Sequence, residues 1–402
     1  MKILIVNECA RMFGGTERYL HTLIPELVQR GHSVGLVHGD IPDRNAETVI
    51  SNRLCLSWPF GQLGLQRTID QVRAWAPDLL YCQGVVSPEL EEALTARYPS
   101  IFYGHGYYGT CATGSKVHTF PIIRPCSRQL SPMCLLLHLP LRCGGLNPVT
   151  TINGYRVQLR RKNILKRHAA VLVANSHMRR EFAQNGVDPG KIHVVPLPLD
   201  EFNSQLKAPT PKKPSGKLLF MGRLTDLKGV HYLLRAISVA QTKLSFQLAL
   251  TVAGEGPEEE QLRKAASQMN LKVNFAGWVG QKDLPGLLAQ SDLLAVPSVW
   301  PEPFGLVGLE AASNGVPAVA FDVGGISSWL KAGVSGELAP GDPPRIDGLA
   351  DAIVLALSDP NHYNHLRQGA WSFARQFAAN HHVQKLESIM VRARSYAAAR
   401  TQ

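Results

Sequence analysis

The segment that most restricts the fold is the apolar run Asp292–Pro297, together with the loop and the helix after it. An uninterrupted apolar run of this length is typical of a strand buried on both faces of a parallel sheet. Pro301 and Pro303 then favour a loop over an early helix. Gly305 opens an apolar, Ala-rich helix that ends near Asn314-Gly315. Strand, loop and helix in this order predict an α/β fold with parallel sheets.

Two carboxylates bracket this turn, Glu302 in the loop and Glu310 in the helix. The backbone N–H groups of Phe304, Gly305 and Leu306 would point out of the helix N-terminus, where an anion is stabilised. A turn that offers N–H groups to phosphate and carboxylates to hydroxyls suits a nucleotide-sugar. Taken alone, the segment is explained equally well as an ordinary turn with two solvated glutamates.

Size and composition indicate a globular protein of two domains. At 402 residues the chain is longer than one usual domain. Its apolar runs fall short of the roughly 20 residues that span a bilayer, and its first strand is too short for a signal peptide. We therefore expect a cytoplasmic protein whose seven cysteines stay largely reduced.

Positive charge is concentrated in the first half. The net charge is +11, and residues 93–180 contain 13 Lys and Arg but no Asp or Glu. Such a stretch attracts an anionic membrane surface, a pyrophosphate-bearing lipid, an acidic glycan or nucleic acid, unless it is merely a basic surface. The chain contains no compact nucleic-acid motif, so nucleic acid is not an expected partner.

The N-terminal half, residues 1–200, begins with a strand, the pair Gly14-Gly15 and a helix over 17–30 with Thr16 as its N-cap. This is a Rossmann-like opening without the G-x-G-x-x-G spacing of dinucleotide sites. A later strand, 100–104, is followed by His105, which lies between two glycines. This histidine either contacts a ligand or is a loop residue with no function in binding.

An insertion over residues 106–150 interrupts the alternation of strands and helices. It carries Cys111, Cys126, Cys134 and Cys143 at spacings without a close pair. Structural zinc sites usually contain close C-x2–4-C pairs, so reduced thiols are favoured over a metal site. The role of these four cysteines stays open.

A proline-rich linker over 201–216 precedes the C-terminal domain, residues 217–375, and a last helix within 376–402 is expected to pack back on the N-terminal domain. In the C-terminal domain a strand ends in Gly222, with Arg223 and Lys228 beside the next helix start. Two cations there hold a diphosphate, or else are solvated surface charges. Two further glycine turns come later, Gly254-Glu255-Gly-Pro257 and Gly277-Trp278-Val279-Gly280.

Taken together, the Gly222-Arg-Leu-Thr-x-x-Lys-Gly229 segment, Gly254-Glu-Gly-Pro257 and the Glu-x7-Glu turn resemble the family 4 glycosyltransferases of glycosyl transferase group 1 type. The resemblance covers essentially the whole chain and is strongest over 217–340. It implies the GT-B fold, with two Rossmann-like domains whose parallel sheets face an interdomain cleft.

The resemblance also implies roles for individual residues. Arg223 and Lys228 would neutralise the donor diphosphate without a metal, Glu302 would bind sugar hydroxyls, and His105 would meet the transferred sugar. The implied donor-binding positions are Gly15 at the diphosphate, Trp278 and Val279 beside the base, Phe304, Gly305 and Leu306 at sugar or phosphate oxygens, and Glu310 at the ribose, together with Gly222 and Glu255.

The implied activity is retaining transfer of a hexosyl group from a nucleotide-sugar to a glycan or lipid-linked acceptor, in the synthesis of cell-surface polysaccharide such as lipopolysaccharide. Neither cofactor nor metal is implied. The alternative within this fold is a nucleotide-sugar epimerase. The basic stretch and the apolar segment 135–141 suggest peripheral attachment at the inner face of the cytoplasmic membrane, although 135–141 is equally explained as core.

Overall fold

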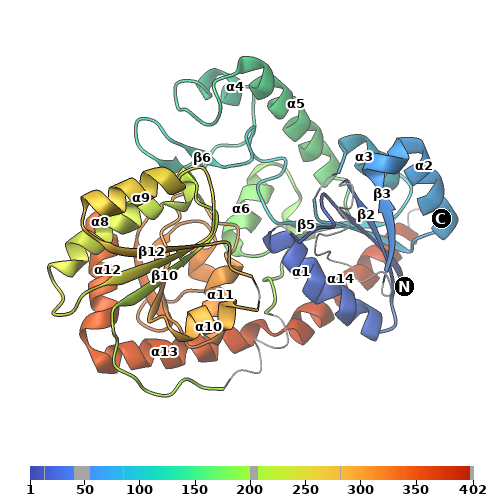
Figure 1. The fold of residues 1–402 in the computed structure, drawn as a ribbon. Coiled ribbons are helices and arrows are strands. Elements are labelled where there is room, and N and C mark those ends of the chain that lie inside the picture. Colours follow the sequence, from blue (N-terminus) through green and yellow to red (C-terminus); the bar gives the residue numbers. More distant parts are fainter. Residues whose placement is uncertain (13, 40–54, 85, 200–206, 281, 399–402) are drawn as a thin grey trace. The chain divides into compact units, whose positions relative to one another are not determined.

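The structure is a computed structural model that describes residues 1–12, 14–39, 55–84, 86–199, 207–280 and 282–398. The chain divides into two compact units (Figure 1). The first comprises Met1–Lys116, Ser127–Pro198 and Ala379–Gln402, and the second Val117–Cys126 and Leu199–Ala378. Both units are built on a parallel sheet, which confirms the predicted α/β class.

The sheet of the first unit has seven parallel strands in the order β3-β2-β1-β4-β5-β8-β9. Its central strands are apolar throughout, as burial on both faces requires; Ile3, Leu4 and Ile5 are fully buried. The strands are β1 (Lys2–Asn7), β2 (Ser33–His38), β3 (Cys55–Pro59), β4 (Leu79–Cys82), β5 (Ser100–Gly104), β8 (Ala170–Val173) and β9 (Ile192–Val194).

The helices of this unit are α1 (Gly15–Gln29), α2 (Phe60–Trp75), α3 (Pro88–Thr95), α4 (Met133–Leu137), α5 (Pro148–Leu165), α6 (Ser176–Gln184) and α14 (Ala379–Ala398), with a 3-10 turn at Pro189–Lys191. Helix α1 begins at Gly15 with Gly14 as N-cap, so Thr16 lies inside the helix, and Pro25 is accommodated within it. Helix α14 packs on α1, where Glu387 pairs with Arg30 at 2.9 Å and His32 at 2.8 Å. None of the described helices has the length and apolar character needed to span a bilayer.

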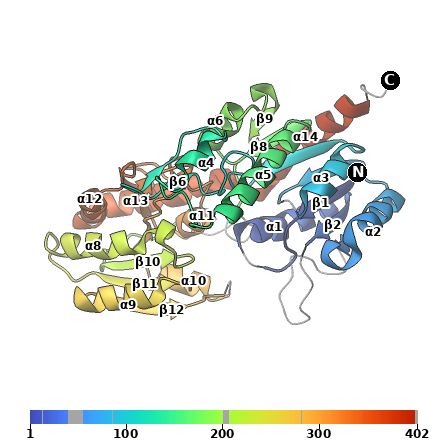
Figure 2. The ribbon, with the colours of Figure 1, turned by 90° about the horizontal axis from the view of Figure 1, so that it is seen from above.

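The cysteine-bearing insertion folds into small pieces. Strands β6 (Val117–His118) and β7 (Arg124–Pro125) form an antiparallel pair, and α4 precedes α5, which lies beside it (Figure 1, Figure 2). Residues 117–126 belong to the second unit, where Arg124 pairs with Asp342 at 2.7 Å, and not to the N-terminal domain as expected. The structure contains no disulfide among the described residues, which include all seven cysteines.

The second unit contains a six-stranded parallel sheet in the order β12-β11-β10-β13-β14-β15. Its strands are β10 (Lys217–Met221), β11 (Ala249–Ala253), β12 (Lys272–Gly277), β13 (Leu293–Val296), β14 (Ala318–Asp322) and β15 (Gly336–Pro340). The order reverses beside β10, the first strand of this sheet along the chain, whose neighbours are β11 and β13. This is the strand order of a Rossmann sheet.

Helices of the second unit lie in two groups. Helix α8 packs against α9 and α12, and α11 packs against α13 (Figure 1). The helices are α8 (Val230–Gln241), α9 (Glu259–Gln268), α10 (Leu284–Ala289), α11 (Leu306–Ser313), α12 (Ile346–Ser358) and α13 (Pro360–Ala374), with 3-10 turns at Asp226–Lys228, Ile326–Ser328 and Arg375–Phe377.

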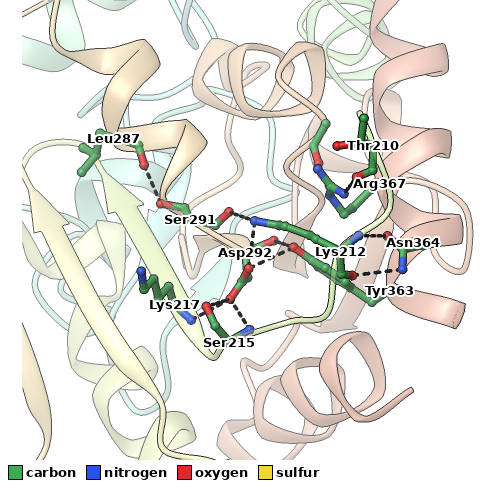
Figure 3. A network of polar contacts seen from close by, with 11 residues as sticks. Thr210, Lys212, Ser215, Lys217, Leu287, Ser291, Asp292, Tyr363, Asn364 and Arg367 are labelled. Carbon is green, nitrogen blue, oxygen red and sulfur yellow. Dashed lines mark hydrogen bonds and ion pairs between the residues drawn. The ribbon is translucent and has the colours of Figure 1, made fainter. Parts of the chain in front are cut away.

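A buried carboxylate anchors the chain that enters this unit (Figure 3). Asp292 Oδ2 accepts hydrogen bonds from the N–H and hydroxyl groups of Ser215 at 2.7 and 2.8 Å, and Oδ1 contacts Lys212 Nζ at 3.0 Å. Asn364 on α13 bonds the backbone of Lys212 in both directions. Of the expected linker 201–216, residues 201–206 lie outside the described residues, and the later part is held along α13. This network precedes β10 and β13, at the opposite end of these strands from the loops that carry the predicted site residues.

Candidate active site

The loops that follow β10 and β13 lie side by side at the carboxyl ends of these strands. Open α/β sheets bind ligands at such a point, where the strand order reverses. The N–H of Val299 donates to the carbonyl of Leu227 at 3.0 Å and joins the loop 297–305 to the loop 222–229. Segments about 70 residues apart in sequence thereby form one surface.

Glycines allow the loops to approach this closely. Gly229 has a φ of +69°, and a Cβ there would lie 2.0 Å from the carbonyl oxygen of Pro297. Gly254 has a φ of +141°, and its Cβ would lie 1.9 Å from the carbonyl oxygen of Gly222. Both positions require glycine, because L-residues disfavour such φ values and a side chain would overlap backbone.

Glu302 occupies the centre of this surface. Its Oε1 lies 2.5 Å from Lys228 Nζ and accepts a hydrogen bond from Ser298 Oγ at 2.6 Å. The side chain is 5% exposed. Lys228 ends the 3-10 turn Asp226–Lys228, and its ammonium also lies 5.7 Å from the ring centroid of Trp300. The structure therefore brings together two residues that the sequence placed in separate motifs.

The environment of Glu302 keeps its carboxyl group ionised. Burial by itself raises the pKa of Glu302, but the charge of Lys228 and hydrogen bonds from Lys228, Ser298 and Trp300 outweigh it. The net effect is a pKa below the ordinary value of 4.5. At neutral pH the site thus contains a carboxylate that accepts, and does not donate, hydrogen bonds.

Helix α11 starts directly beside this pair. Gly305 is its N-cap in the left-handed conformation, and the indole Nε1 of Trp329 donates to the carbonyl of Phe304 at 2.5 Å. Phe304 is 1% exposed and stacks edge-on with Phe377. The packing fixes the direction in which the first N–H groups of the helix point. Glu310 is the fifth residue of α11, a little over one turn into the helix, and is 4% exposed.

The turns after β11 and β12 border the same loops. Leu224 N–H donates to the carbonyl of Glu255 at 2.8 Å, and the N–H of Trp278 donates to Glu255 Oε1 at 3.2 Å. Trp278 is 69% exposed, so its indole offers a flat surface to a ligand, and Val279 beside it is half-buried. Helix α9 begins at Glu259, two residues after Pro257.

Arg223 differs from Lys228 although both lie in one loop. Its side chain is exposed, and it makes no ion pair with any residue that the structure describes. Lys228 already has Glu302 as its partner. The loop thus presents one cation that is held in place and one that reaches into solvent.

The predicted residues of the first unit lie at the carboxyl end of its own sheet. Gly15 is exposed at the start of α1, just after Gly14. His105 follows β5, and its Nε2 lies 2.5 Å from Gln83 Oε1. A carbonyl oxygen only accepts, so Nε2 carries the proton and Nδ1 is the acceptor. Burial, and secondarily the charge of His382, lower the pKa of His105 to about 3, so its imidazole is neutral.

One group in the described residues has the composition of a metal site. Ligand atoms of Cys82, Glu91 and His168 lie within 4.8 Å of one another, all buried. His168 Nδ1 contacts Ser100 Oγ at 2.9 Å and Nε2 contacts Glu91 at 3.3 Å, so both ring nitrogens have protein partners. The cysteines of the insertion, Cys111, Cys126, Cys134 and Cys143, form no such group among the described residues.

Three residues of these surfaces were not predicted, namely Ser298, Gln83 and Trp329. Gln83 could have been found, because it directly follows a buried strand, as His105 does. Ser298 lies in the corresponding position shortly after β13. Trp329 is far from the α11 turn in sequence, and its contact with Phe304 has no local signal.

Comparison with known proteins identifies relatives in sequence and solved structures of similar fold. The chain is 32% identical over 254 residues to the D-inositol 3-phosphate glycosyltransferase of Nocardioides sp., which covers 56% of this chain and 54% of that protein. The chain thus spans about half the length of the curated relatives it matches. Anabaena HepE, solved in complex with UDP and glucose, superposes with a TM-score of 0.68 at 22% identity, over 96% of this chain and 98% of HepE. The lipopolysaccharide outer core galactosyltransferase WaaB superposes with a TM-score of 0.67 at 16% identity, over 97% and 99%.

The structural neighbours identify the fold as GT-B. The family model for Glycosyltransferase Family 4 matches residues 13–201, and the model for Glycosyl transferases group 1 matches residues 202–372. The two matches adjoin and agree with the division of the chain into an N-terminal and a C-terminal half. The chain therefore belongs to the family 4 glycosyltransferases of group 1 type.

Proposed function

We propose that this protein transfers a hexosyl group from a nucleotide-sugar to a glycan or lipid-linked acceptor, with retention of anomeric configuration and without a metal. The observation that carries the proposal is the Lys228–Glu302 contact at the point where the strand order reverses, beside the N-terminus of α11. A cation, a carboxylate and helix N–H groups side by side match the diphosphate and the hydroxyls of such a donor.

The positive groups act on the leaving diphosphate. Arg223 and Lys228 neutralise the charge that develops as the glycosidic bond breaks, and the N–H groups of Phe304, Gly305 and Leu306 bind sugar or phosphate oxygens. The arginine and lysine side chains then supply the positive charge that a metal ion would otherwise bring. We accordingly expect activity to survive treatment with EDTA.

Glu302 orients the sugar and is not a nucleophile. Retaining hydrolases use two carboxylates about 5 Å apart, one of which attacks the sugar. Oε1 of Glu302 is already held by Lys228 and Ser298. In the proposed reaction the acceptor hydroxyl attacks from the face that the diphosphate leaves, and a phosphate oxygen takes the acceptor's proton.

The remaining predicted residues bind the nucleotide and the sugar. Glu310 binds the ribose hydroxyls, and Glu255, Trp278 and Val279 border the base. Gly222 allows the backbone to approach the diphosphate. From the first unit, Gly15 meets the diphosphate and His105, as a neutral imidazole, hydrogen-bonds the transferred sugar.

The acceptor and setting are proposed from relatives and charge. HepE was solved with UDP and glucose, and WaaB is a galactosyltransferase of the lipopolysaccharide outer core. They support a nucleotide-sugar donor and a cell-surface polysaccharide as the product class. We place the enzyme in the cytoplasm, peripheral to the inner face of the membrane.

A screen of nucleotide-sugars tests the proposal. Each donor is incubated with the protein, and thermal stabilisation and slow release of nucleoside diphosphate are measured. A donor that binds is expected to lose most of its turnover with Arg223→Ala, while Glu310→Ala weakens its affinity more than its turnover. Full activity of Arg223→Ala, or unchanged affinity of Glu310→Ala, contradicts these roles. Conversion of the donor into an epimer without acceptor identifies an epimerase instead.

A further inference from the structure

Exposed apolar side chains are concentrated in one stretch of the chain. Of sixteen large apolar residues that are exposed among the described residues, ten fall within residues 120–159. Six of them lie on α4, on the start of α5 and on the loop between, and we call them the apolar patch. Its members are Met133, Leu136, Leu139, Leu146, Val149 and Ile152, with exposures from 41% to 71%.

The patch is the outer face of a packed helix pair. His138 is 3% exposed, and its Nε2 contacts the carbonyl of Gly145 at 2.7 Å and Thr151 Oγ1 at 3.0 Å. This side chain ties α4, the loop and α5 together, and the two helices lie beside each other in both views (Figure 1, Figure 2). Leu136 and Leu139 flank His138 yet point outward, at 70% and 51% exposure, so the segment 135–141 is not simply core.

The charge around the patch has one sign. Residues 127–165 contain six Lys and Arg and no Asp or Glu. Arg128, Arg142 and Arg156 are exposed. Arg160, further along α5, pairs with Glu89 and Glu92 on α3. The exposed arginines are thus close to the patch along the chain: Arg142 lies in the loop between α4 and α5, and Arg156 lies on α5, four residues after Ile152.

We propose that the apolar patch docks on an anionic lipid bilayer, with its leucines at the headgroup–acyl boundary and Arg128, Arg142 and Arg156 on the headgroups. Exposed apolar side chains beside exposed cations are the combination that binds such an interface. A nucleic acid is bound mainly through its charge, so it does not account for the exposed leucines. A second copy of this face carries the same positive charge, so the two copies would repel each other. The docking itself does not depend on the proposed function. Only its purpose does, which is to bring the enzyme to a lipid-linked acceptor.

Co-sedimentation with large unilamellar vesicles tests the docking surface. The full chain is expected to bind vesicles of equal parts phosphatidylglycerol and phosphatidylcholine much more tightly than pure phosphatidylcholine. The variant Leu136→Ser/Leu139→Ser/Leu146→Ser should bind anionic vesicles at least about ten-fold more weakly. Arg142→Gln/Arg156→Gln should lose roughly five-fold per arginine, and less at high salt.

The matched control is Leu355→Ser/Val391→Ser, which removes apolar side chains of 53% and 54% exposure outside the patch and should bind vesicles normally. Equal binding by the triple variant and the wild-type protein, or equal binding to neutral vesicles, overturns the proposal. Dimerisation that only the triple variant abolishes would assign the patch to a second copy instead. Donor hydrolysis is measured on the same samples, so a failure of docking is distinguished from a failure of the proposed activity.

Discussion

The ammonium group of Lys228 lies 2.5 Å from Oε1 of Glu302, and the two residues come from the loops after β10 and β13. The carboxylate is buried and the lysine side chain is about a quarter exposed. Each group fixes the other: Glu302 holds the ammonium near the end of the loop 222–229, and Lys228 helps to keep the carboxylate ionised. The proposed site for a diphosphate and a sugar hydroxyl would thus be arranged before a ligand arrives, which is the condition for electrostatic catalysis.

Replacing Lys228 by alanine should lower the turnover of the bound donor about 10²–10³-fold, because it removes a charge from the leaving diphosphate. It should also destabilise the second unit by about 2–3 kcal/mol, since Glu302 is left buried without its cation; the partial exposure of Lys228 keeps this below the value for a fully buried pair. Single-turnover kinetics and urea unfolding measure the two effects.

The double variant Lys228→Ala/Glu302→Gln separates the effect on turnover from the effect on stability, because it should recover stability but not activity. The control is Lys243→Ala, which breaks an exposed pair with Asp351 and should change neither. Wild-type turnover in Lys228→Ala would exclude the leaving-group role.

Stability of the first unit should fall as the pH drops from 6.5 towards 4. Burial lowers the pKa of His382 to about 4 and that of His105 to about 3, so the unfolded chain binds protons in this range while the native state does not. Each histidine then contributes at most about 1.4 kcal/mol per pH unit to the slope of the unfolding free energy against pH. His382→Gln should flatten the fall, as measured by urea unfolding at several pH values.

The neighbouring His381 is exposed, and His381→Gln should leave the pH profile unchanged. Tyr19, which bonds His382 at 2.9 Å, and the cation Lys385 also face the ring and remain in both variants. A profile for His382→Gln as steep as that of the wild type would show that this ring is not buried neutral.

Gly229→Ala should destabilise the second unit by more than about 2 kcal/mol and abolish donor binding. The backbone there has a φ of +69°, and a Cβ would overlap the carbonyl of Pro297, so the loops after β10 and β13 would be forced apart. Gly286→Ala is the matched control, because a Cβ at that helical position meets open space; it should be neutral or stabilising by up to about 1 kcal/mol. Thermal melts with and without donor compare them, and normal donor binding by Gly229→Ala would refute the close approach.

Gln83→Leu should reduce transfer about 10- to 100-fold with little change in donor affinity, because it removes the acceptor that holds the His105 ring. Gln83→Glu restores an acceptor and, as a negative charge, should raise the pKa of His105 while recovering part of the activity. An NMR titration of His105 alongside turnover tests both effects. Wild-type turnover in Gln83→Leu would exclude the positioning role.

Much of the fold was predictable because its signals are local. Apolar runs such as 293–296 identified the buried parallel strands, and Gly305 and Gly315 marked the ends of α11. Where a boundary depended on longer contacts, the prediction was wrong. The pair Gly324-Gly325 after a buried strand predicts the start of another helix, but only a 3-10 turn follows it. Gly324 packs on the backbone of Pro301 and Glu302, and the N–H of Gly325 donates to the carbonyl of Glu302.

The candidate site was predictable only as separate motifs. Arg223, Lys228, Glu302 and Glu310 were all chosen from sequence, yet solvated surface charge explained each of them as well. The structure distinguishes them by burial: Glu302 and Glu310 are almost fully buried, Lys228 is paired, and Arg223 reaches into solvent.

Sequence by itself determined the kinds of element and the chemistry available in each loop, since both depend on neighbouring residues. Only the tertiary structure decided which loops meet. The strand order puts β13 beside β10, and that neighbourhood brings Lys228 to Glu302. The same is true of the apolar patch, where Leu136 and Leu139 are exposed while His138 between them is buried and contacts Thr151 on α5. Burial and pairing are properties of contacts across many residues, and the linear pattern does not contain them.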